Sequence, residues 1–129
     1  MFQQNAYRLP AEWEPQSGVQ LTWPHAHTDW TPMLREVTAT YEEMARQIRQ
    51  REPLLVVGPP TNDTWARDHA FITLTADDAP PRLLDFCFNG WGEKFPAELD
   101  NAINRRLYDD GSVSGEYVTC SRSKSVSLH

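Results

Sequence analysis

The stretch Leu54-Leu55-Val56-Val57-Gly58-Pro59-Pro60 runs directly into Thr61-Asn62-Asp63-Thr64-Trp65-Ala66-Arg67-Asp68. The four apolar residues predict a buried strand, which the glycine and the two prolines end. The polar residues that follow bring carboxylates, an indole ring and a guanidinium group into one loop. A carboxylate can accept two parallel N–H bonds from a planar cation, and an aromatic ring offers that cation its negative face. Because α/β proteins build binding sites on loops of this kind, the pattern predicts a site for a guanidinium-like group.

The segment before this loop predicts a strand followed by a helix. Residues 19–23 alternate between apolar and polar side chains, and Pro24 ends the alternation, as expected of a strand. A helix is expected next, with Thr31 as its N-cap, Pro32 at its first position and Pro53 beyond its end. Its apolar face consists of residues that recur at helical spacing, namely Leu34, Val37, Tyr41, Met44, Ala45 and Ile48. The first half of the chain therefore has the order strand, helix, strand.

The segment after the loop predicts two more strands and a second helix. Strands are expected at 70–75 and 82–88, on either side of a turn at 77–81. The second helix is expected to begin near Pro96. Its apolar face is expected to consist of Phe95, Leu99, Ala102, Ile103 and Leu107. The complete order is a mixed α/β pattern that hints at one repeated unit.

The bulk composition is that of one globular domain. A chain of 129 residues with 40% hydrophobic residues can bury one core but not two. The formal net charge of −6 argues against a nucleic-acid partner and suits a cationic ligand. The sequence predicts no membrane association, because no apolar stretch approaches the ~20 residues that cross a bilayer and the N-terminus lacks a signal-peptide pattern. With Cys87 and Cys120 as the only cysteines, a cytoplasmic protein without a disulfide framework is expected.

Four blocks of sequence, taken in order, resemble one known family. They are Leu9-Pro10-Ala11-Glu12-Trp13-Glu14-Pro15, Leu21-Thr22-Trp23-Pro24-His25 followed by Asp29-Trp30, Asn62-Asp63-Thr64-Trp65-Ala66-Arg67-Asp68, and Phe88-Asn89-Gly90-Trp91-Gly92-Glu93-Lys94-Phe95. Together they resemble the N-terminal portion of the agmatine deiminase and bacterial-type peptidyl-arginine deiminase family. The likeness runs from about Leu9 to Leu107, and the order and spacing of the blocks make it specific.

The resemblance implies a guanidine-group-modifying fold of the pentein type. That fold is an α/β propeller, a closed ring of five ββαβ units, of which this chain would supply about two. The propeller region would cover residues 1–110. Residues 111–129 lie outside the resemblance and are rich in serine, so we expect a disordered tail there. An opened ring would expose strand edges, which predicts self-association.

The resemblance also implies the hydrolysis of a guanidinium C–N bond without a metal or any other cofactor. A cysteine thiolate attacks the guanidinium carbon, a histidine acts as acid and base, and two carboxylates hold the nitrogens. The products are a ureido compound and ammonia. Agmatine, which yields N-carbamoylputrescine in putrescine biosynthesis, is favoured over peptidyl-arginine because no secretion signal is present. The motifs themselves do not separate these two substrates.

Three residues of the opening loop match positions of the family's substrate site. Asp68 would be the catalytic carboxylate that grips the guanidinium, Trp65 would line the pocket beside it, and Asp63 would support or shape the entrance. Each residue also has a structural alternative. Asp68 could pair with Arg67 or cap a turn, and Trp65 could pack in the core. Asp63 could form a turn after the two prolines.

The rest of the family's catalytic set has no match in this sequence. The family's nucleophilic cysteine and its histidine lie further along a longer chain. Cys87 is expected to pack inside a strand, Cys120 lies in the serine-rich tail, and His69 is expected to be half-exposed at the start of a strand. His25 and His27 alone do not make a zinc site.

We therefore expect this chain to be inactive by itself, as a fragment, a truncated or frameshifted product, or one piece of a complementary pair. The alternative is a non-catalytic structural or guanidinium-binding module.

Overall fold

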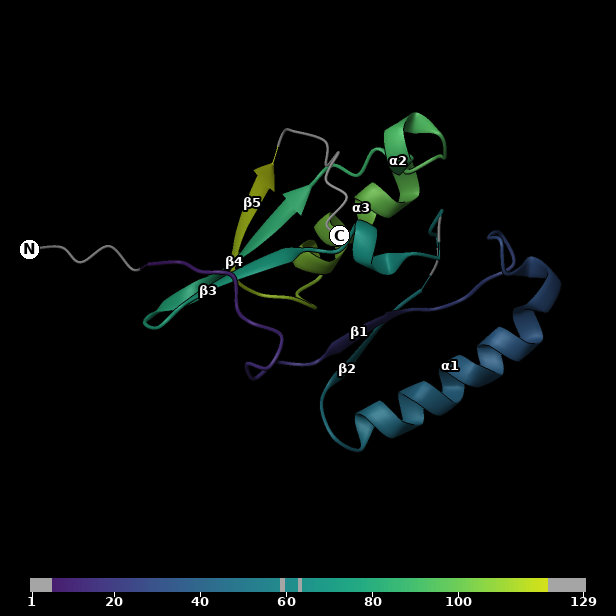
Figure 1. The fold of residues 1–129 in the computed structure, drawn as a ribbon, viewed down its shortest axis with the longest axis horizontal. Coiled ribbons are helices and arrows are strands. Elements are labelled where there is room, and N and C mark those ends of the chain that lie inside the picture. The colour runs from purple at the N-terminus through teal and green to yellow at the C-terminus, as the bar shows by residue number, and fades with distance from the viewer. Residues whose placement is uncertain (1–5, 59, 63, 121–129) are drawn as a thin grey trace, which may run out of the picture.

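The computed structural model describes residues 6–58, 60–62 and 64–120 of the chain, and its architecture is α/β. The strands form two small sheets, one with two strands and one with three. In each sheet a helical connection joins two parallel strands (Figure 1). The α/β class expected from the sequence is therefore confirmed. Within the described ranges, no helix has both the length and the apolar character that a membrane crossing requires.

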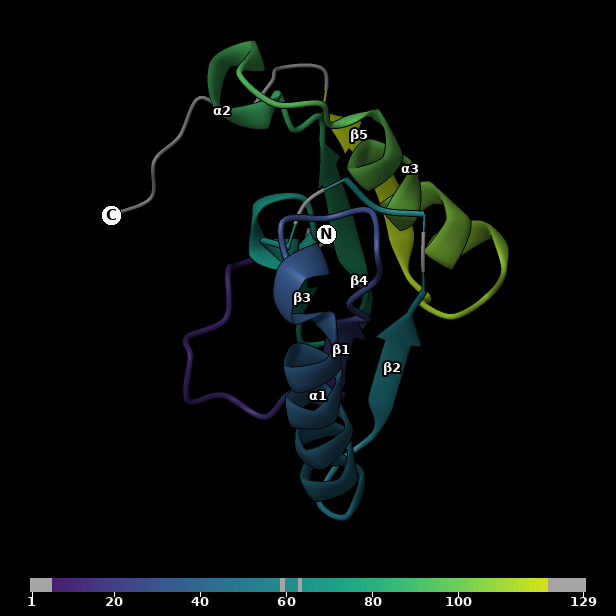
Figure 2. The same cartoon turned by 90° about the vertical axis from the view of Figure 1, so that its right-hand side faces the viewer.

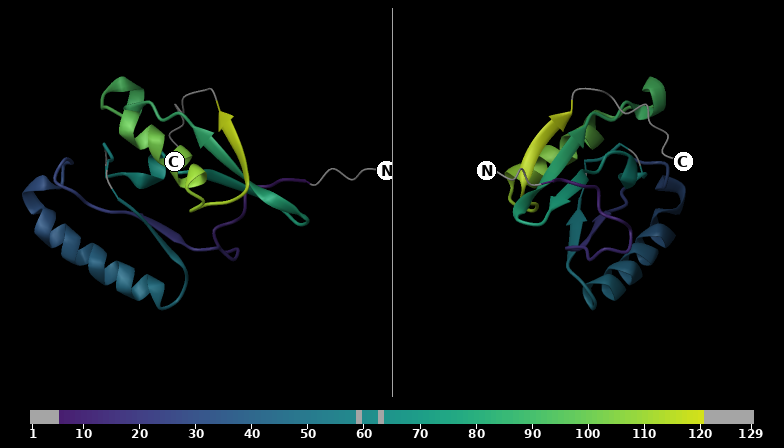
Figure 3. Two further views of the ribbon diagram at one scale, coloured as in Figure 1. Left: turned by 180° about the vertical axis from the view of Figure 1, so that it is seen from behind. Right: turned by 60° about the vertical axis from the view of Figure 1, so that its left-hand side comes forward.

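The smaller sheet pairs β1 (Val19–Thr22) with β2 (Leu54–Val57) in parallel. Parallel strands require a crossover, which consists here of the short 3-10 helix η1 (Thr31–Met33) and the helix α1 (Leu34–Arg49). α1 runs alongside the two strands (Figure 2). It lies on the side of this sheet that faces away from the larger sheet (Figure 3). Because the two strands are parallel, the loops after β1 and β2 leave the sheet at the same edge.

The start of α1 differs from the expectation. Thr31 lies inside η1, and the N-cap residue of α1 is Met33, which makes no side-chain cap. The Thr31 hydroxyl is instead 2.6 Å from the carbonyl oxygens of both Ala26 and Thr28. The N-cap prediction is wrong because this hydroxyl donates to the turn before the helix and does not accept a helical N–H. Of the expected apolar face, Met44 is exposed and the other residues are half-buried.

The larger sheet has the order β3 (Ile72–Ala76), β4 (Ala79–Phe86) and β5 (Glu116–Cys120). β3 and β4 form an antiparallel hairpin, whereas β5 runs parallel to β4. The crossover between β4 and β5 contains the short element α2 (Gly90–Glu93) and the helix α3 (Glu98–Asp109). The segment from β3 to β5 is therefore one ββαβ unit.

β4 begins at Ala79, so Pro80 and Pro81 lie within a strand and not in the expected turn. The prolines are tolerated because the ladder is interrupted at this place. The pairing of β3 with β4 shifts register between Leu74 and Ala76, and the pairing of β4 with β5 starts only at Arg82. A ladder that is irregular here does not require the backbone N–H that proline lacks.

β5 lies within residues 111–129, which we expected to be a disordered tail. That expectation is wrong for Glu116–Cys120, which pair in regular parallel register with β4, and residues 121–129 lie outside the described ranges. The chain reverses after α3 at Gly111, where φ is 81°, and the Ser112 N–H donates to the Leu107 carbonyl at 3.0 Å. A glycine in this conformation is a usual helix ending.

The hydrophobic core lies between β2 and α3. Val57, Ile103 and Leu107 form a buried cluster, and Leu55 and Val113 pack against it. Leu55 and Val57 are two residues apart in β2 and so face the same side of the smaller sheet. Ile103 and Leu107 lie one turn apart on α3. The cluster therefore joins the smaller sheet to the crossover of the larger one, and the loop after β2 begins at this junction.

Candidate functional site

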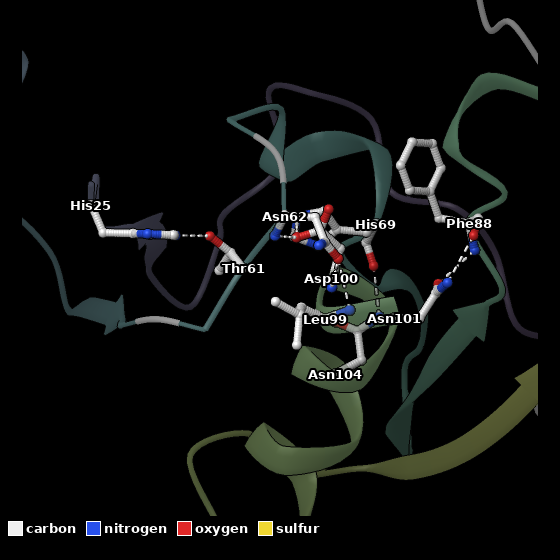
Figure 4. Close-up of polar contacts among 9 residues, drawn as sticks. All are labelled: His25, Thr61, Asn62, His69, Phe88, Leu99, Asp100, Asn101 and Asn104. Carbon is white, nitrogen blue, oxygen red and sulfur yellow. Dashed lines mark hydrogen bonds and ion pairs between the residues drawn. The ribbon is translucent and has the colours of Figure 1, made fainter. Parts of the chain in front are cut away.

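Three of the four sequence blocks meet near the N-terminal end of α3 (Figure 4). These blocks follow the carboxyl ends of β1, β2 and β4. The first two are joined by Nε2 of His25 and Oγ1 of Thr61, which lie 2.6 Å apart. Open α/β sheets bind ligands outside the carboxyl ends of their strands. The three loops therefore form the candidate site.

The block at 9–15 makes a different set of contacts. The Glu14 carboxylate accepts a hydrogen bond from the Arg8 guanidinium at 2.7 Å, and the Trp13 side chain is largely exposed. Arg8 also forms an antiparallel bridge with Thr75 in β3. This block therefore attaches the N-terminal segment to the larger sheet.

Asn62 joins the loop after β2 to the first turn of α3. Its Oδ1 accepts hydrogen bonds from the backbone N–H groups of Leu99 at 2.7 Å and Asp100 at 3.3 Å. In return, the Asn62 N–H donates to Oδ1 of Asp100 at 2.7 Å. The N-cap residue of α3 is Ala97, which makes no side-chain cap. Asn62 thus supplies the cap from a distant part of the chain, in the reciprocal form of a capping box.

A buried polar network continues inward from this cap. Asp100, Asn104 and His69 are all buried. Nδ2 of Asn104 donates to the carbonyl of His69 at 2.8 Å and to Oδ1 of Asp85 at 2.9 Å. Nε2 of His69 lies 3.9 Å from Oδ1 of Asp100. Because buried polar groups are costly unless they are paired, these contacts attach the loop to α3 at two points, Asn62 and His69.

α3 also holds the loop after β4. Oδ1 of Asn101 accepts a hydrogen bond from the Phe88 N–H at 2.7 Å, and Nδ2 of Asn101 donates to the Phe88 carbonyl at 2.8 Å. Since β4 ends at Phe86, the Asn101 side chain provides the partners that a neighbouring strand would otherwise supply. One helix therefore positions both loops.

Residues Gly90–Glu93, which form α2, adopt a left-handed turn. φ is 57° at Trp91 and 65° at Glu93, and it is positive at both glycines as well. A residue with a Cβ loses about 1–2 kcal/mol in this conformation. The Trp91 ring packs edge-to-face against Phe88 and Phe95, with ring centroids 5.1 and 5.6 Å away. Packing of the ring thus offsets part of the backbone strain, and strain of this kind is concentrated at functional sites.

The structure places two of the predicted site residues on one turn. Trp65 precedes the 3-10 helix η2 (Ala66–Asp68), and Asp68 ends it, with the Asp68 N–H donating to the Trp65 carbonyl at 3.1 Å. Trp65 is 66% exposed, which places its ring outside the core, and Asp68 is half-buried. The third predicted residue, Asp63, lies outside the described residues. Trp65 and Asp68 therefore lie on one turn of the loop.

Two other residues lie in surroundings that differ from the expectation. Cys87, expected to pack inside a strand, is exposed because β4 ends at Phe86. It borders an open groove whose lining includes Asn89 and Lys94. His69 was expected to be half-exposed at a strand start, but it is buried. It follows η2 as the C-cap residue, and β3 begins only three residues later.

The apolar spacing in the sequence predicted the wrong buried face for α3. Phe95, Leu99 and Ala102 were expected to be buried, but all three are exposed. The buried residues of α3 are Asp100, Ile103, Asn104 and Leu107. Their spacing is the signal that could have found them, because two polar residues share a helix face with two apolar ones. A polar residue at a core position requires a partner, so this pattern indicates a tertiary hydrogen-bond network.

The described residues contain no group of three or more His, Cys, Asp or Glu side chains placed to hold a metal ion. His27 and Asp29 have the spacing of a His-x-Asp pair, but both side chains are exposed in the loop before η1. The His27 N–H donates to Nδ1 of His25 at 3.2 Å. The candidate binding groups on the loop after β2 are the Asp68 carboxylate and the Trp65 ring.

The polar network predicts a loss of stability at high pH. Burial and a hydrogen bond to Asp85 raise the pKa of Tyr117 from 10.0 to about 12. The folded state holds this proton more tightly than the unfolded chain does. The stability from Tyr117 is therefore complete below pH 10 and is lost as the pH rises through about 12. Urea unfolding from neutral pH to about pH 12 should show a steeper alkaline decline for the wild type than for Tyr117→Phe, and identical declines would contradict the assignment.

Comparison with known proteins relates this chain to deiminases. The family model described as Porphyromonas-type peptidyl-arginine deiminase matches residues 8–61 and 55–121. The match passes the expected limit at residue 110 and includes β5. The agmatine deiminase of Pseudomonas aeruginosa (strain LESB58) is 24% identical over 131 residues, which cover 81% of this chain and 36% of that protein.

Solved structures show the same relationship. The agmatine deiminase of C. jejuni with substrate bound has a TM-score of 0.78 and 30% identity, and the likeness covers 92% of this chain and 41% of that chain. The agmatine deiminase of Enterococcus faecalis has a TM-score of 0.63 at 22% identity, over 89% of this chain and 38% of that one, and shows likeness of fold alone. This chain thus spans between 36% and 41% of the length of these three proteins.

Proposed function

Because the chain belongs to the Porphyromonas-type peptidyl-arginine deiminase family, we propose that it supplies the guanidinium-binding corner of an agmatine-hydrolysing enzyme. One observation carries the proposal. The loop after β2 presents Trp65 and Asp68 on a single turn, and α3 holds that loop at Asn62 and His69. Agmatine is favoured over peptidyl-arginine because the curated relative and the substrate-bound structure compared above are agmatine deiminases, whereas the matching family model is described by peptidyl-arginine.

In the proposed reaction, a guanidinium group loses one nitrogen as ammonia and gains an oxygen from water. A cysteine thiolate forms a C–S bond as ammonia leaves, and water then breaks that bond and restores the thiolate. The product from agmatine is N-carbamoylputrescine, a step toward putrescine. In this reaction the Asp68 carboxylate accepts N–H bonds from the planar cation, and the Trp65 ring covers one of its faces. The net charge of −6 favours the approach of a cation.

We place the thiolate, the acid–base histidine and the second carboxylate in the part of the fold that this chain does not match. In that arrangement the segment from β3 to β5 is one ββαβ unit of a five-unit propeller, and β1, α1 and β2 belong to another. The share of the relatives that the chain spans supports about two units of five. Open strand edges would then bind the remaining units or a second copy. The free cysteines suit a reducing cytoplasm.

Asp68→Asn tests the binding role directly. We expect this chain to bind agmatine weakly, with a Kd of about 1 mM, because it holds only part of the clamp. Asp68→Asn should weaken binding by about tenfold or more, because the amide removes both the charge and one acceptor. Isothermal titration calorimetry measures both values. Asp78→Asn is the matched control, since it makes the same charge change at an exposed position between β3 and β4. Equal binding by Asp68→Asn and the wild type would remove Asp68 from the site.

An ammonia-release assay tests the placement of the nucleophile. We expect the wild-type chain to release no ammonia from agmatine by itself, and the Cys87→Ser protein to behave in the same way. Turnover by the wild-type chain would refute our placement of the nucleophile outside the matched region. Turnover that Cys87→Ser abolished would assign the nucleophile to Cys87.

A further inference from the structure

The geometry points to Asn62 and Asp100 as positioning residues that hold the loop bearing Trp65 and Asp68 in its binding conformation. We do not propose that either residue contacts the substrate. Their effect on ligand affinity rests on the proposed function, whereas their effect on the order of the loop does not.

The first turn of α3 depends on the loop. Ala97 occupies the N-cap position, and its methyl group cannot accept a hydrogen bond. The N–H groups of Leu99 and Asp100 bond instead to the Asn62 side chain, at 2.7 and 3.3 Å. The first N–H groups of a helix have no partner within the helix and must find one elsewhere. Forming α3 therefore selects the loop conformation that brings Asn62 to it.

Asp100 completes this attachment. Its Oδ1 accepts the Asn62 N–H at 2.7 Å, so the backbone and the side chain of Asn62 are both held. Asp100 is 0% exposed. A buried carboxylate is costly unless hydrogen bonds and local dipoles compensate for lost water, and the first turn of a helix supplies such a dipole. The Asn62 N–H and the helix dipole supply part of that compensation at Oδ1, which ties the carboxylate to this loop geometry.

The far end of the loop has its own attachment to the same helix. Asn104 donates to the His69 carbonyl at 2.8 Å, seven residues after Asn62. A short segment that is held at both ends has few conformations, so less order must be gained when a ligand binds. Asp68 is the residue next to the second attachment. A displacement of either end would therefore move its carboxylate.

Trypsin cleavage after Arg67 measures the order of the loop without any ligand. Arg67 is exposed, and cleavage there requires the loop to open. Asn62→Ala removes the cap and should speed this cleavage about fivefold, because cleavage follows the population of the open form. It should also weaken agmatine binding by about fivefold. Mass spectrometry of the products identifies the cut, and calorimetry gives the affinity.

Two further variants separate positioning from general stability. Asn62→Asp keeps an acceptor at the helix N-terminus, where negative charge is favoured, and should restore both the cleavage rate and the affinity. Ile103→Val removes one buried methyl from the same helix without touching the loop contacts. Ile103→Val should lower the urea midpoint and leave agmatine affinity and cleavage after Arg67 unchanged.

Asn62→Ser is a milder variant that should give a cleavage rate between those of the wild type and Asn62→Ala. With this variant the test does not depend on the folding of Asn62→Ala.

The outcomes are distinguishable. If Asn62→Ala lowers the urea midpoint as Ile103→Val does but leaves cleavage and affinity at wild-type values, Asn62 is structural only and the inference is overturned. If the wild type does not bind agmatine, the proposed function fails. Faster cleavage in Asn62→Ala, reversed in Asn62→Asp, would still establish that the cap holds the loop.

Discussion

Replacing Ile103 with alanine should lower the free energy of unfolding by about 2–5 kcal/mol. Ile103 is 0% exposed and belongs to the buried cluster with Val57 and Leu107. The substitution removes buried methyl groups and leaves a cavity that this small core cannot refill. Domains of this size are stable by only about 5–15 kcal/mol, so a large part of the total would be lost. Urea unfolding followed by tryptophan fluorescence measures the change.

Leu99→Ala provides the matched control on the same helix. Leu99 was expected on the buried face, but it is 40% exposed. Its truncation should cost about 1 kcal/mol or less. If the two variants lowered the urea midpoint equally, the assignment of the buried face of α3 would be wrong.

The elements around the loop could be predicted because their signals are local. The apolar run that forms β2 is followed at once by a glycine and two prolines, and α1 shows its half-buried face through spacing alone. The presence of Trp65 and Asp68 on one turn also follows from their short spacing, since Trp65 immediately precedes η2 and Asp68 is its last residue. Local signals of this kind require no knowledge of distant contacts.

The attachment of the loop could not be predicted in the same way. Asp100 and Asn104 face the core only because Asn62 and His69 meet them there, from segments more than thirty residues earlier. A pattern that assigns polar residues to the surface places them on the wrong side of α3. β5 was missed for a related reason, since a short strand with few large apolar residues depends on its partner strand. The loop attachment and β5 both depend on contacts between residues that are distant in the sequence.

Replacing Gly90 with alanine should destabilise the protein by at least about 3 kcal/mol. A Cβ at this position would lie 2.0 Å from the carbonyl oxygen of Phe95, and φ at Gly90 is 64°. The oxygen cannot move away alone, because the Phe95 N–H donates to the Gly90 carbonyl at 3.2 Å and closes the turn. The turn must therefore open, which separates the Trp91 ring from Phe95. We expect a lower urea midpoint and a loss of near-UV circular dichroism.

Gly92→Ala isolates the cause of that loss. φ at Gly92 is 78°, but no atom lies within 4 Å of an added Cβ, so this variant carries only the left-handed strain of about 1–2 kcal/mol. The difference in unfolding free energy between Gly90→Ala and Gly92→Ala measures the cost of the close approach to Phe95. Equal urea midpoints would contradict that cost.

The loop after β4 and the loop after β2 should open independently of each other. Asn101 holds Phe88 on the near side of the turn, so Gly90→Ala should leave cleavage after Arg67 unchanged below the unfolding transition. Faster cleavage would show that the turn and the loop bearing Asp68 open together.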